Sequence, residues 1–249
     1  MPFKLDMNLI IDVGNTNVKI AVFENGVCLE KHTVQNSAMV SRVKTLLGKH
    51  PTINKGIIAS VARLDLLQID SLKTLLDFTL ELSHTTTLPY KNLYKTPKTL
   101  GVDRLALVSA AVRRYPNTNV LVVDAGTCIT YDFVNDQSEY LGGAISPGMG
   151  LRYKALNALT ANLPLLEPKA PLNLTGESTE TAIHSGVVYG IAKEIDGVIA
   201  EYRDIHKDLT VIFTGGDANF LSKQLKSSIF ANPNFLLEGL NFILDYNSN

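Results

Sequence analysis

Two short acidic turns, each at the end of an apolar strand and in opposite halves of the chain, constrain the fold more than any other feature. The apolar run at residues 8–11 leads into Asp12-Val-Gly14, and the run at residues 120–123 leads into Asp124-Ala-Gly126. An Asp-x-Gly turn supplies a carboxylate, small side chains and backbone N–H donors, which are the groups needed to hold a phosphate chain and its metal ion. One such turn is also an ordinary hairpin sequence. Two of them, each opening one half of the chain, predict two facing lobes with a nucleotide between them.

Composition excludes several classes of protein. The 249 residues suffice for one large domain or two small ones with a real core. A formal net charge of −1 gives no basic face for nucleic acid. Two cysteines, Cys28 and Cys128, are too few for a disulfide framework. No apolar run reaches the roughly 18 residues that span a bilayer, and the N-terminus lacks the layout of a signal peptide. We therefore expect a cytoplasmic protein with no membrane or nucleic-acid partner.

The first half opens with three strands and continues with alternating helices and strands. Asn25-Gly26 is a strong hairpin signal between the second and third strands, since both residues tolerate positive φ. The expected strands are 9–13, 18–23, 27–34 and 56–61, the expected helices are 37–49, 66–78 and 102–115, and 84–100 reads as a loop.

The second half repeats this opening. We expect strands at 120–124, 129–134, 139–145 and 210–213, and helices at about 149–160, 179–203, 217–228 and 239–246. Strands that alternate with helices predict a mixed sheet covered on both faces. The repeated three-strand meander indicates duplication of one unit, with an N-terminal lobe at 1–115 and a C-terminal lobe at 116–249.

The turn at residues 12–19 carries the first candidate site. Gly14 lets the backbone approach a phosphate, Asn15 and Thr16 add polar contacts, and Lys19 supplies positive charge. A tight hairpin with a solvated lysine explains the same residues. Neither the Walker spacing nor the dinucleotide-binding glycine pattern is present.

Residues 101–104, Gly-Val-Asp-Arg, form the second candidate site, where a loop enters a helix. Asp103 either caps the helix, a favourable position beside the helix dipole, or accepts a proton from an attacking hydroxyl. Arg104 is either solvated or grips an anionic group in a bidentate manner.

Further candidates lie in the second half. Asp124 is a candidate cation ligand, and Thr127 is placed to reach nucleotide phosphate. The glycine-dense segment 142–150 is either a plain loop and helix start or a place where backbone closely approaches another group. Thr179 is either an N-cap or a substrate contact. Gly215 and Gly216, in the turn 214–218, either contact the nucleotide at a helix N-terminus or form an ordinary connection capped by Asp217.

Two other chemistries find no support. The five histidines show no metal-ligand spacing, and two distant cysteines make a structural zinc site a poor interpretation. The Gly-x-Ser-x-Gly pattern of a serine hydrolase is missing.

Taken together and in order, these segments resemble the type III pantothenate kinases, members of the acetate kinase, sugar kinase, Hsp70 and actin superfamily. The resemblance runs from Asp12 to Ala218. Its most selective parts are Asp-x-Gly-Asn-Thr-x-x-Lys at residue 12, Gly-x-Asp-Arg at residue 101 and Gly-Gly-x-Ile-x-Pro-Gly at residue 142. The resemblance implies an α/β fold with two duplicated ribonuclease H-like lobes, each a mixed sheet opened by a β-meander, in an actin-like ATPase architecture.

The resemblance also implies ATP-dependent phosphorylation of pantothenate to 4′-phosphopantothenate, the first step of coenzyme A synthesis, by a homodimer that uses Mg²⁺. Asp103 would be the catalytic base, and Asp124 would bind a monovalent cation, K⁺ or NH₄⁺. The implied ATP-binding residues are Asp12, Gly14, Asn15, Thr16, Lys19, Thr127, Gly215 and Gly216. The implied substrate-binding residues are Tyr94, Gly101, Val102, Asp103, Arg104 and Thr179.

Two alternatives stay open at this point. One is a small-molecule kinase of the same superfamily with a different acceptor, because spacing alone does not define the acceptor pocket. The other is a non-catalytic regulatory accessory protein, which would have no need for both Asp103 and Asp124.

Overall fold

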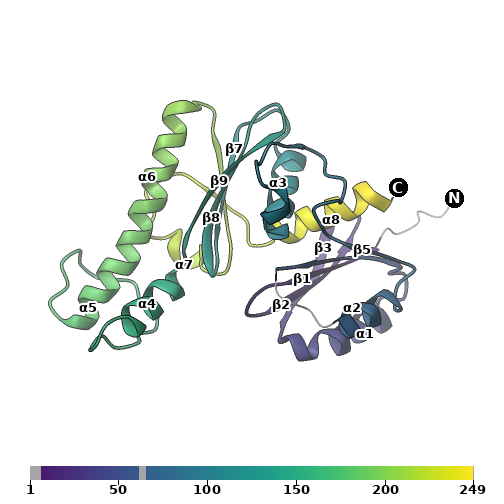
Figure 1. Ribbon diagram of the computed structural model, residues 1–249, viewed down its shortest axis with the longest axis horizontal. Helices are drawn as coiled ribbons and strands as arrows, with labels where there is room; N and C mark the ends of the chain where they lie inside the picture. The colour runs from purple at the N-terminus through teal and green to yellow at the C-terminus, as the bar shows by residue number, and fades with distance from the viewer. Residues whose placement is uncertain (1–6, 62–65, 249) are drawn as a thin grey trace. The chain divides into compact units, whose positions relative to one another are not determined.

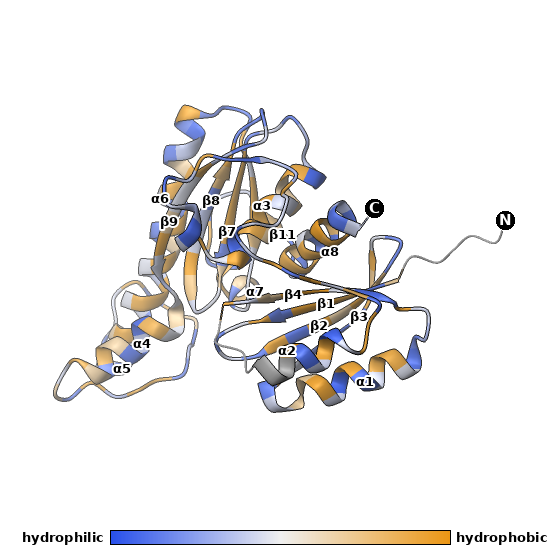
Figure 2. Cartoon of the chain, turned by 45° about the vertical axis from the view of Figure 1, so that its right-hand side comes forward, coloured by the Kyte–Doolittle hydropathy of each residue, from blue (hydrophilic) through white to orange (hydrophobic). Residues whose placement is uncertain are grey.

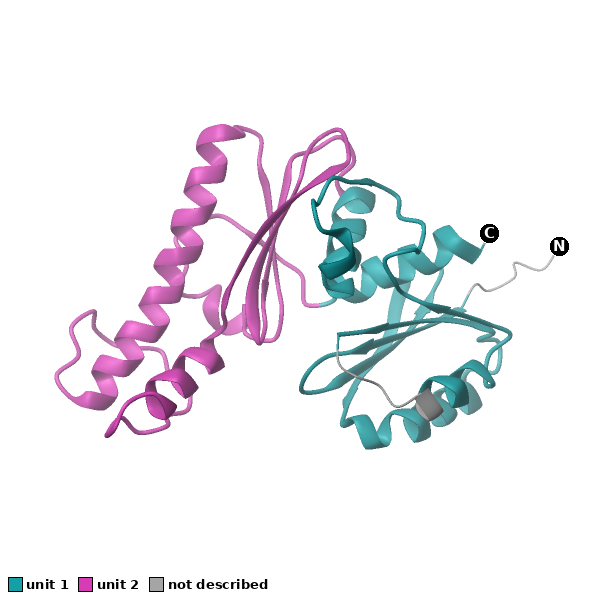
Figure 3. Ribbon diagram, viewed as in Figure 1, with its two compact units in different colours: residues 1–114, 234–249 teal, residues 115–233 magenta. Residues whose placement is uncertain are grey.

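The computed structural model describes residues 7–61 and 66–248 of the chain (Figure 1). The chain forms two compact units, one of residues 1–114 and 234–249 and the other of residues 115–233 (Figure 3). We call them unit 1 and unit 2 and describe each by itself. Their boundary lies one residue before the predicted one, and the last helix, α8 (Phe235–Ser248), belongs to unit 1 and not to the predicted C-terminal lobe. The physical reason is its packing against α3 (Val102–Arg114), where an added Cβ on Gly239 would lie 1.9 Å from the Ala106 carbonyl oxygen.

The sheet of unit 1 has the strand order β3-β2-β1-β4-β5. Its strands are β1 (Met7–Val13), β2 (Val18–Glu24), β3 (Val27–Val34), β4 (Lys55–Ser60) and β5 (Phe78–Glu81). The first three form an antiparallel meander, whereas β4 runs parallel to β1 and β5 parallel to β4. Unit 1 also contains the short β6 (Lys91–Asn92) and the 3₁₀ turns η1 (Asn36–Ala38) and η2 (Pro97–Thr99).

Alternation along β1 separates the two faces of this sheet. Leu9, Ile11 and Val13 point to one face and belong to a core cluster with buried residues of α1 (Met39–Lys49). A buried residue of α2 (Leu66–Lys73) belongs to the same cluster. Figure 1 shows α1 and α2 on one side of the sheet and α3 and α8 on the other. Colouring by hydropathy shows apolar residues along the central strands (Figure 2). On the α8 side, Asn8 Nδ2 donates to Asn241 Oδ1 at 2.7 Å.

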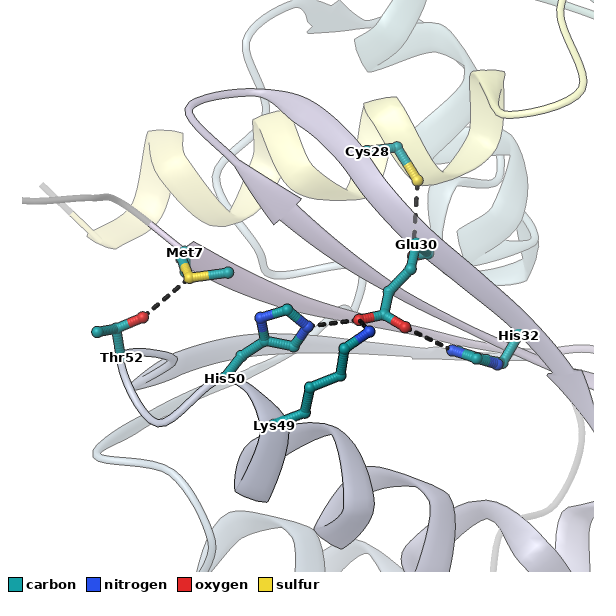
Figure 4. Close-up of polar contacts among 7 residues, drawn as sticks. All are labelled: Met7, Cys28, Glu30, His32, Lys49, His50 and Thr52. Carbon is teal, nitrogen blue, oxygen red and sulfur yellow. Dashed lines mark hydrogen bonds and ion pairs between the residues drawn. The ribbon is translucent and has the colours of Figure 1, made fainter.

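A cluster of polar side chains surrounds Glu30 on the α1 face (Figure 4). Lys49 Nζ lies 2.8 Å from Glu30 Oε1, His32 Nε2 lies 3.0 Å from Oε2, and His50 Nε2 also contacts Oε1. These bonds, with that from Lys49 the largest influence, lower the pKa of Glu30 from 4.5 to about 2. The ionised carboxylate is therefore favoured by folding.

Stability should accordingly depend on this carboxylate in acid. Because the folded pKa of Glu30 is the lower one, its contribution is complete above pH 4.5 and is lost as the pH falls from 4.5 towards 2. We expect Glu30→Gln to lower the free energy of unfolding at pH 6 and to make no difference near pH 2. Urea unfolding across this range measures the effect, and Glu24→Gln is the matched control. A constant difference between Glu30→Gln and the wild type at every pH would contradict this assignment.

The sheet of unit 2 repeats the same arrangement. The strand order within the unit is β11-β10-β7-β8-β9, with β7 (Val120–Ala125), β8 (Cys128–Val134) and β9 (Glu139–Pro147) forming the antiparallel meander. Strand β10 (Thr210–Thr214) runs parallel to β7, and β11 (Phe230–Ala231) runs parallel to β10. One core cluster joins this sheet to α4 (Met149–Ala158), α5 (Thr179–His184) and α6 (Gly190–Ile205). The expected mixed sheets, each opened by a meander, are confirmed.

Three predicted helices are shortened or interrupted, and the helix expected at 239–246 is longer, since α8 spans Phe235–Ser248. The helix expected at 66–78 ends at Lys73, because the chain turns and pairs β5 with β4. The helix expected at 179–203 contains a π-helical turn, η3 (Ser185–Tyr189), between α5 and α6. The helix expected at 217–228 is only α7 (Ala218–Leu221), since the Asp196 carboxylate instead accepts bonds from the backbone N–H groups of residues 226 and 227. Within the described part of the chain, no helix has the length and apolar character to cross a membrane.

Candidate active site

In unit 1, the first acidic turn follows β1 and presents a carboxylate beside a lysine. Asp12 and Lys19 are cross-strand partners, and Lys19 Nζ lies 3.7 Å from Asp12 Oδ2. The Gly14 N–H donates to the Asn17 carbonyl at 3.1 Å and closes the turn. Asp12 is only 8% exposed, whereas Asn15 and Thr16 are exposed at the tip. The turn therefore offers polar groups outward from a fixed carboxylate.

The second candidate segment starts α3 and orients the Asp103 carboxylate. Asp103 Oδ1 accepts from the Arg104 N–H at 2.8 Å, and the same N–H is 3.1 Å from the Gly101 carbonyl. A Cβ on Gly101 would lie 2.3 Å from Asp103 Oδ1, so glycine is needed for the carboxylate to fold back over this turn. Val102 is buried, which turns its side chain into the core. These contacts hold the Asp103 side chain in one orientation at the N-terminus of α3.

Burial makes the Asp12 and Asp103 carboxylates of unit 1 reluctant to ionise. Burial raises the pKa of Asp12 to about 6, with Lys19 opposing the rise and the nearby charge of Asp103 adding to it. Burial also raises the pKa of Asp103, against the lowering effect of the Arg104 N–H and guanidinium. A carboxylate with a raised pKa is a stronger base, and such groups concentrate at functional sites. This electrostatic link also places the two predicted motifs in one neighbourhood.

Tyr94 and Arg104, predicted as substrate contacts, lie together. The Arg104 guanidinium carbon is 5.7 Å from the centroid of the Tyr94 ring, a cation–π distance. Arg104 is 4% exposed, so its guanidinium is held among protein groups. The Tyr94 N–H donates to Asn92 Oδ1 at 3.0 Å, which fixes the backbone that carries the ring.

Two residues that sequence reasoning did not select hold this segment in place. His84 Nε2 lies 2.9 Å from the Leu100 carbonyl, directly before Gly101. The Tyr90 hydroxyl donates to the Leu105 carbonyl at 3.3 Å. Both partners are backbone carbonyls, so no side-chain spacing in the sequence could have revealed these contacts.

In unit 2, the Asp124 turn and the Thr-Gly-Gly turn are neighbours. Asp124 and Thr214 are paired at the ends of the parallel strands β7 and β10. Gly215 has φ +103°, and a Cβ there would lie 2.4 Å from Asp124 Oδ1 and 2.3 Å from the Ala125 carbonyl oxygen. The Asp217 N–H also donates to the Ala125 carbonyl at 2.9 Å. Asp217 occupies the N-cap position of α7 without a side-chain cap bond.

The glycine-dense segment meets the same turn. The Gly148 N–H donates to the Thr127 carbonyl at 3.0 Å. A Cβ on Gly148 would lie 2.2 Å from the Gly126 carbonyl oxygen, so the approach requires glycine. The Thr127 side chain is on the exposed surface of the turn. Thr130 is the cross-strand partner of Asp124, and the described residues provide no hydrogen-bond partner for its buried hydroxyl.

Thr179 is not the N-cap of its helix. Ser178 occupies that position and forms a capping box with Thr181, in which each side chain bonds the backbone N–H of the other. Thr179 is the first residue of α5, is exposed, and lines a groove of about 850 Å³ between α4 and α5. Its hydroxyl is therefore not needed for capping.

The predicted residues thus fall into two sets, one in each unit. Unit 1 brings together the Asp12 turn, the Asp103 turn and Tyr94, and unit 2 brings together the Asp124, Thr127 and Gly215 turns. In both units, acidic and glycine-rich turns follow the carboxyl ends of strands. Carboxyl ends of strands are where α/β sheets bind their ligands.

The fold, two units that each contain a mixed sheet opened by a meander, is shared with solved structures. A glucokinase of the ROK family from Streptomyces griseus, solved with glucose and AMPPNP, superposes with a TM-score of 0.52 at 10% identity, covering 97% of this chain and 99% of that one. A Campylobacter jejuni protein named for the Baf family of transcriptional activators gives a TM-score of 0.62 at 22% identity, covering 96% and 98%. These likenesses establish the fold.

The chain belongs to the type III pantothenate kinase family. The profile of that family matches residues 8–201. The type III pantothenate kinase of Christiangramia forsetii is 52% identical over 241 residues, which cover 97% of this chain and 99% of the relative. The resemblance seen in the sequence is confirmed.

Proposed function

We propose that this chain phosphorylates pantothenate with ATP and Mg²⁺ to give 4′-phosphopantothenate, the first step of coenzyme A synthesis. Family membership supports the reaction. The observation that carries the residue assignment is the Asp103 carboxylate, with its raised pKa, fixed beside the Arg104–Tyr94 pair. Asp103 as a base and Arg104 as a cation, both in the first turn of α3, suit an acceptor molecule that has a hydroxyl at one end and a carboxylate at the other.

The proposed step needs alignment and charge neutralisation more than covalent chemistry. The pantothenate hydroxyl oxygen bonds to the γ-phosphorus of ATP while the bond from that phosphorus to the β–γ bridging oxygen breaks. ADP leaves, and the hydroxyl proton passes to the Asp103 carboxylate. Lys19 and the Asn15–Thr16 tip would contact the phosphates, and the Asp12 carboxylate suits Mg²⁺ because that ion prefers oxygen ligands. Bound Mg²⁺ supplies neutralisation of the phosphate charge.

Arg104 would clamp the pantothenate carboxylate. We expect Arg104→Ala to raise the KM for pantothenate by roughly 10- to 100-fold, as loss of a charge-assisted contact should. The KM for ATP should change little, because no ATP contact is assigned to this residue. Initial rates at varied concentrations of each substrate measure both constants, with Arg42→Ala on α1 as the control. An unchanged KM for pantothenate would count against the clamp.

Asp124 would bind a monovalent cation, K⁺ or NH₄⁺. The buried Thr130 hydroxyl across the strand supports this assignment, because it offers a second oxygen on the same pair of strands. K⁺ and NH₄⁺ are both large, weakly hydrated cations that a carboxylate and neutral oxygens can accommodate.

The proposal includes a homodimer, and the groove between α4 and α5 supports it. Leu159, which lines this groove, is 84% exposed, and Leu172 and Leu174 in the same unit are 94% and 73% exposed. Exposed apolar side chains beside a groove are typical of interaction surfaces. Light scattering after size exclusion should give the mass of two chains, and Leu159→Arg should lower it. A wild-type monomer at micromolar concentration would remove the dimer from the proposal.

The test of the reaction is ADP release with ATP, Mg²⁺ and pantothenate, in potassium and in sodium at equal ionic strength. Pantothenate-dependent turnover that requires potassium supports both the acceptor and the cation site. Equal turnover in potassium and in sodium would support the kinase activity but contradict the proposed monovalent-cation site at Asp124. No turnover in potassium from folded protein would favour another acceptor or a regulatory role. Cytoplasmic location belongs to the same proposal, and the free Cys28 and Cys128 thiols suit a reducing compartment.

A further inference from the structure

One arginine ties together the corner of unit 2 where β9 ends and α4 begins. Arg152 Nε donates to the Pro147 carbonyl at 2.9 Å, and Arg152 Nη2 donates to Ser146 Oγ at 3.1 Å. The same Nη2 also contacts Glu194 Oε2 on α6. The guanidinium therefore fixes two consecutive residues of the corner and connects them to a second helix.

Glu194 is the centre on which these bonds converge. The Tyr131 hydroxyl on β8 donates to Glu194 Oε1 at 2.9 Å, so the carboxylate joins β8, β9, α4 and α6. Burial raises the pKa of Glu194, but the bonds from Arg152, Ser146 and Tyr131 outweigh it and the net pKa lies below the ordinary value. The side chains of Arg152 and Glu194 are 22% and 27% exposed, so the ion pair is largely shielded from water. Charge-assisted bonds in such surroundings are the stronger ones.

The corner held by this ion pair touches the Asp124 turn. Directly after Pro147, the Gly148 N–H donates to the Thr127 carbonyl at 3.0 Å. The Gly148 backbone also approaches the Gly126 carbonyl so closely that a Cβ would lie 2.2 Å from its oxygen. A shift of residues 147–148 therefore cannot leave the Gly126–Thr127 peptide in place.

We propose that Arg152 and Glu194 are positioning residues that hold the Thr127 turn for nucleotide phosphates, acting through Pro147 and Gly148. This inference rests on the proposed function, in which Thr127 contacts ATP. Preorganised contacts matter because a displacement of about 1 Å in a binding group can weaken its action by about 10²-fold.

The core of unit 2 does not depend on this pair. Met149 and Tyr153 anchor α4, and Ile191 and Ile195 anchor α6, all buried in one apolar cluster. Loss of the ion pair should therefore leave the fold intact while it loosens the corner. That separation allows a positioning role to be distinguished from a structural one.

The experiment measures the affinity for the nucleotide directly, by calorimetric titration of MgADP and of a non-hydrolysable ATP analogue. We expect Arg152→Met and Glu194→Gln each to weaken nucleotide binding by about tenfold. Glu194 does not line the groove between α4 and α5, so Glu194→Gln should leave the KM for pantothenate and the oligomeric state unchanged. Arg203→Met is the matched control, because Arg203 on α6 also bonds a backbone carbonyl, that of Ser228 at 2.7 Å, but far along the helix from the corner. It should bind nucleotide as the wild type does.

A double-mutant cycle with Thr127→Ala tests whether Arg152 acts through the turn. If it does, Arg152→Met should weaken binding much less in the Thr127→Ala background than alone, since coupled residues are not additive. Additive losses would overturn the proposal, as would unchanged affinity in both Arg152→Met and Glu194→Gln. If Thr127→Ala itself binds normally, the proposed function has misplaced the phosphate contact. If only Thr127→Ala weakens binding, the proposed function stands and the positioning role fails.

Discussion

Asp103→Asn should leave the chain folded and able to bind ATP, yet lower kcat by about 10²- to 10⁴-fold, the usual contribution of a general base. The substituted amide has the shape of the carboxylate, and its oxygen can still accept from the Arg104 N–H, the bond that orients Asp103 in the wild type. It cannot accept the proton of the acceptor hydroxyl. The chemical step therefore loses its base while the site keeps its geometry.

Four measurements examine this result. The circular dichroism spectrum and the thermal unfolding temperature of Asp103→Asn should match those of the wild type, and calorimetry should give the same affinity for MgADP. Only the rate of ADP release should fall. Asp70→Asn, an exposed carboxylate on α2, is the control for the loss of one negative charge from unit 1. Near-normal turnover in Asp103→Asn would refute the assignment of the base.

The wild type adds a pH test of the same residue. Burial raises the pKa of Asp103, so protonation removes the base at a pH above the ordinary 3.8. Activity should fall as the pH is lowered through that raised pKa, and the acid limb should be absent from the residual rate of Asp103→Asn.

The second large effect is expected from Gly215→Ala, which should lower the free energy of unfolding by about 2–4 kcal/mol. The position has φ +103°, and the added Cβ would lie 2.3 Å from the Ala125 carbonyl oxygen and 2.4 Å from Asp124 Oδ1. Both the backbone and the cation-binding carboxylate of the proposal would have to move. We therefore expect nucleotide affinity and any potassium dependence to be lost together with stability.

Gly216→Ala is the matched control one residue further on. No atom lies within 4 Å of a Cβ added there, and its φ is not positive. The free energy of unfolding of Gly216→Ala should stay within about 0.5 kcal/mol of that of the wild type, as for ordinary surface changes. If the nucleotide binds near this open position, the affinity of Gly216→Ala for the nucleotide should nevertheless fall. Denaturant unfolding of both variants gives the comparison. Equal stability of Gly215→Ala and the wild type would contradict the close approach of the two turns.

Local signals predicted the strands of the two meanders and their turns well, because these depend on neighbouring residues. The Asn25-Gly26 hairpin forms with both residues at positive φ, 50° and 80°. The meanders that open the two units follow from the alternation of apolar residues and from such turns. Helix lengths were less certain, since the chain at residues 74–81 continues a helix-like apolar pattern but pairs as β5 once β4 is beside it.

Contacts to the backbone account for what was missed at the site. His84 was considered only as a metal ligand, yet it bonds the Leu100 carbonyl. Arg152 and Glu194 were not selected, because Glu194 lies 42 residues from Arg152 and 63 residues from Tyr131 in the sequence. Thr179 was left between an N-cap and a substrate contact, and the cap proved to be Ser178.

The sequence by itself determined the two meanders, the acidic and glycine-rich turns and, through their combination, the family, because strand periodicity and turn chemistry depend on adjacent residues. The short strands β5, β6 and β11 were not predicted. The tertiary structure alone decided that α8 returns to unit 1, that Gly215 lies against Asp124 and that Arg152 reaches Glu194. Those relations depend on packing between segments distant along the chain. Burial in that packing, and not the identity of the residues, is what raises the pKa values of Asp12 and Asp103.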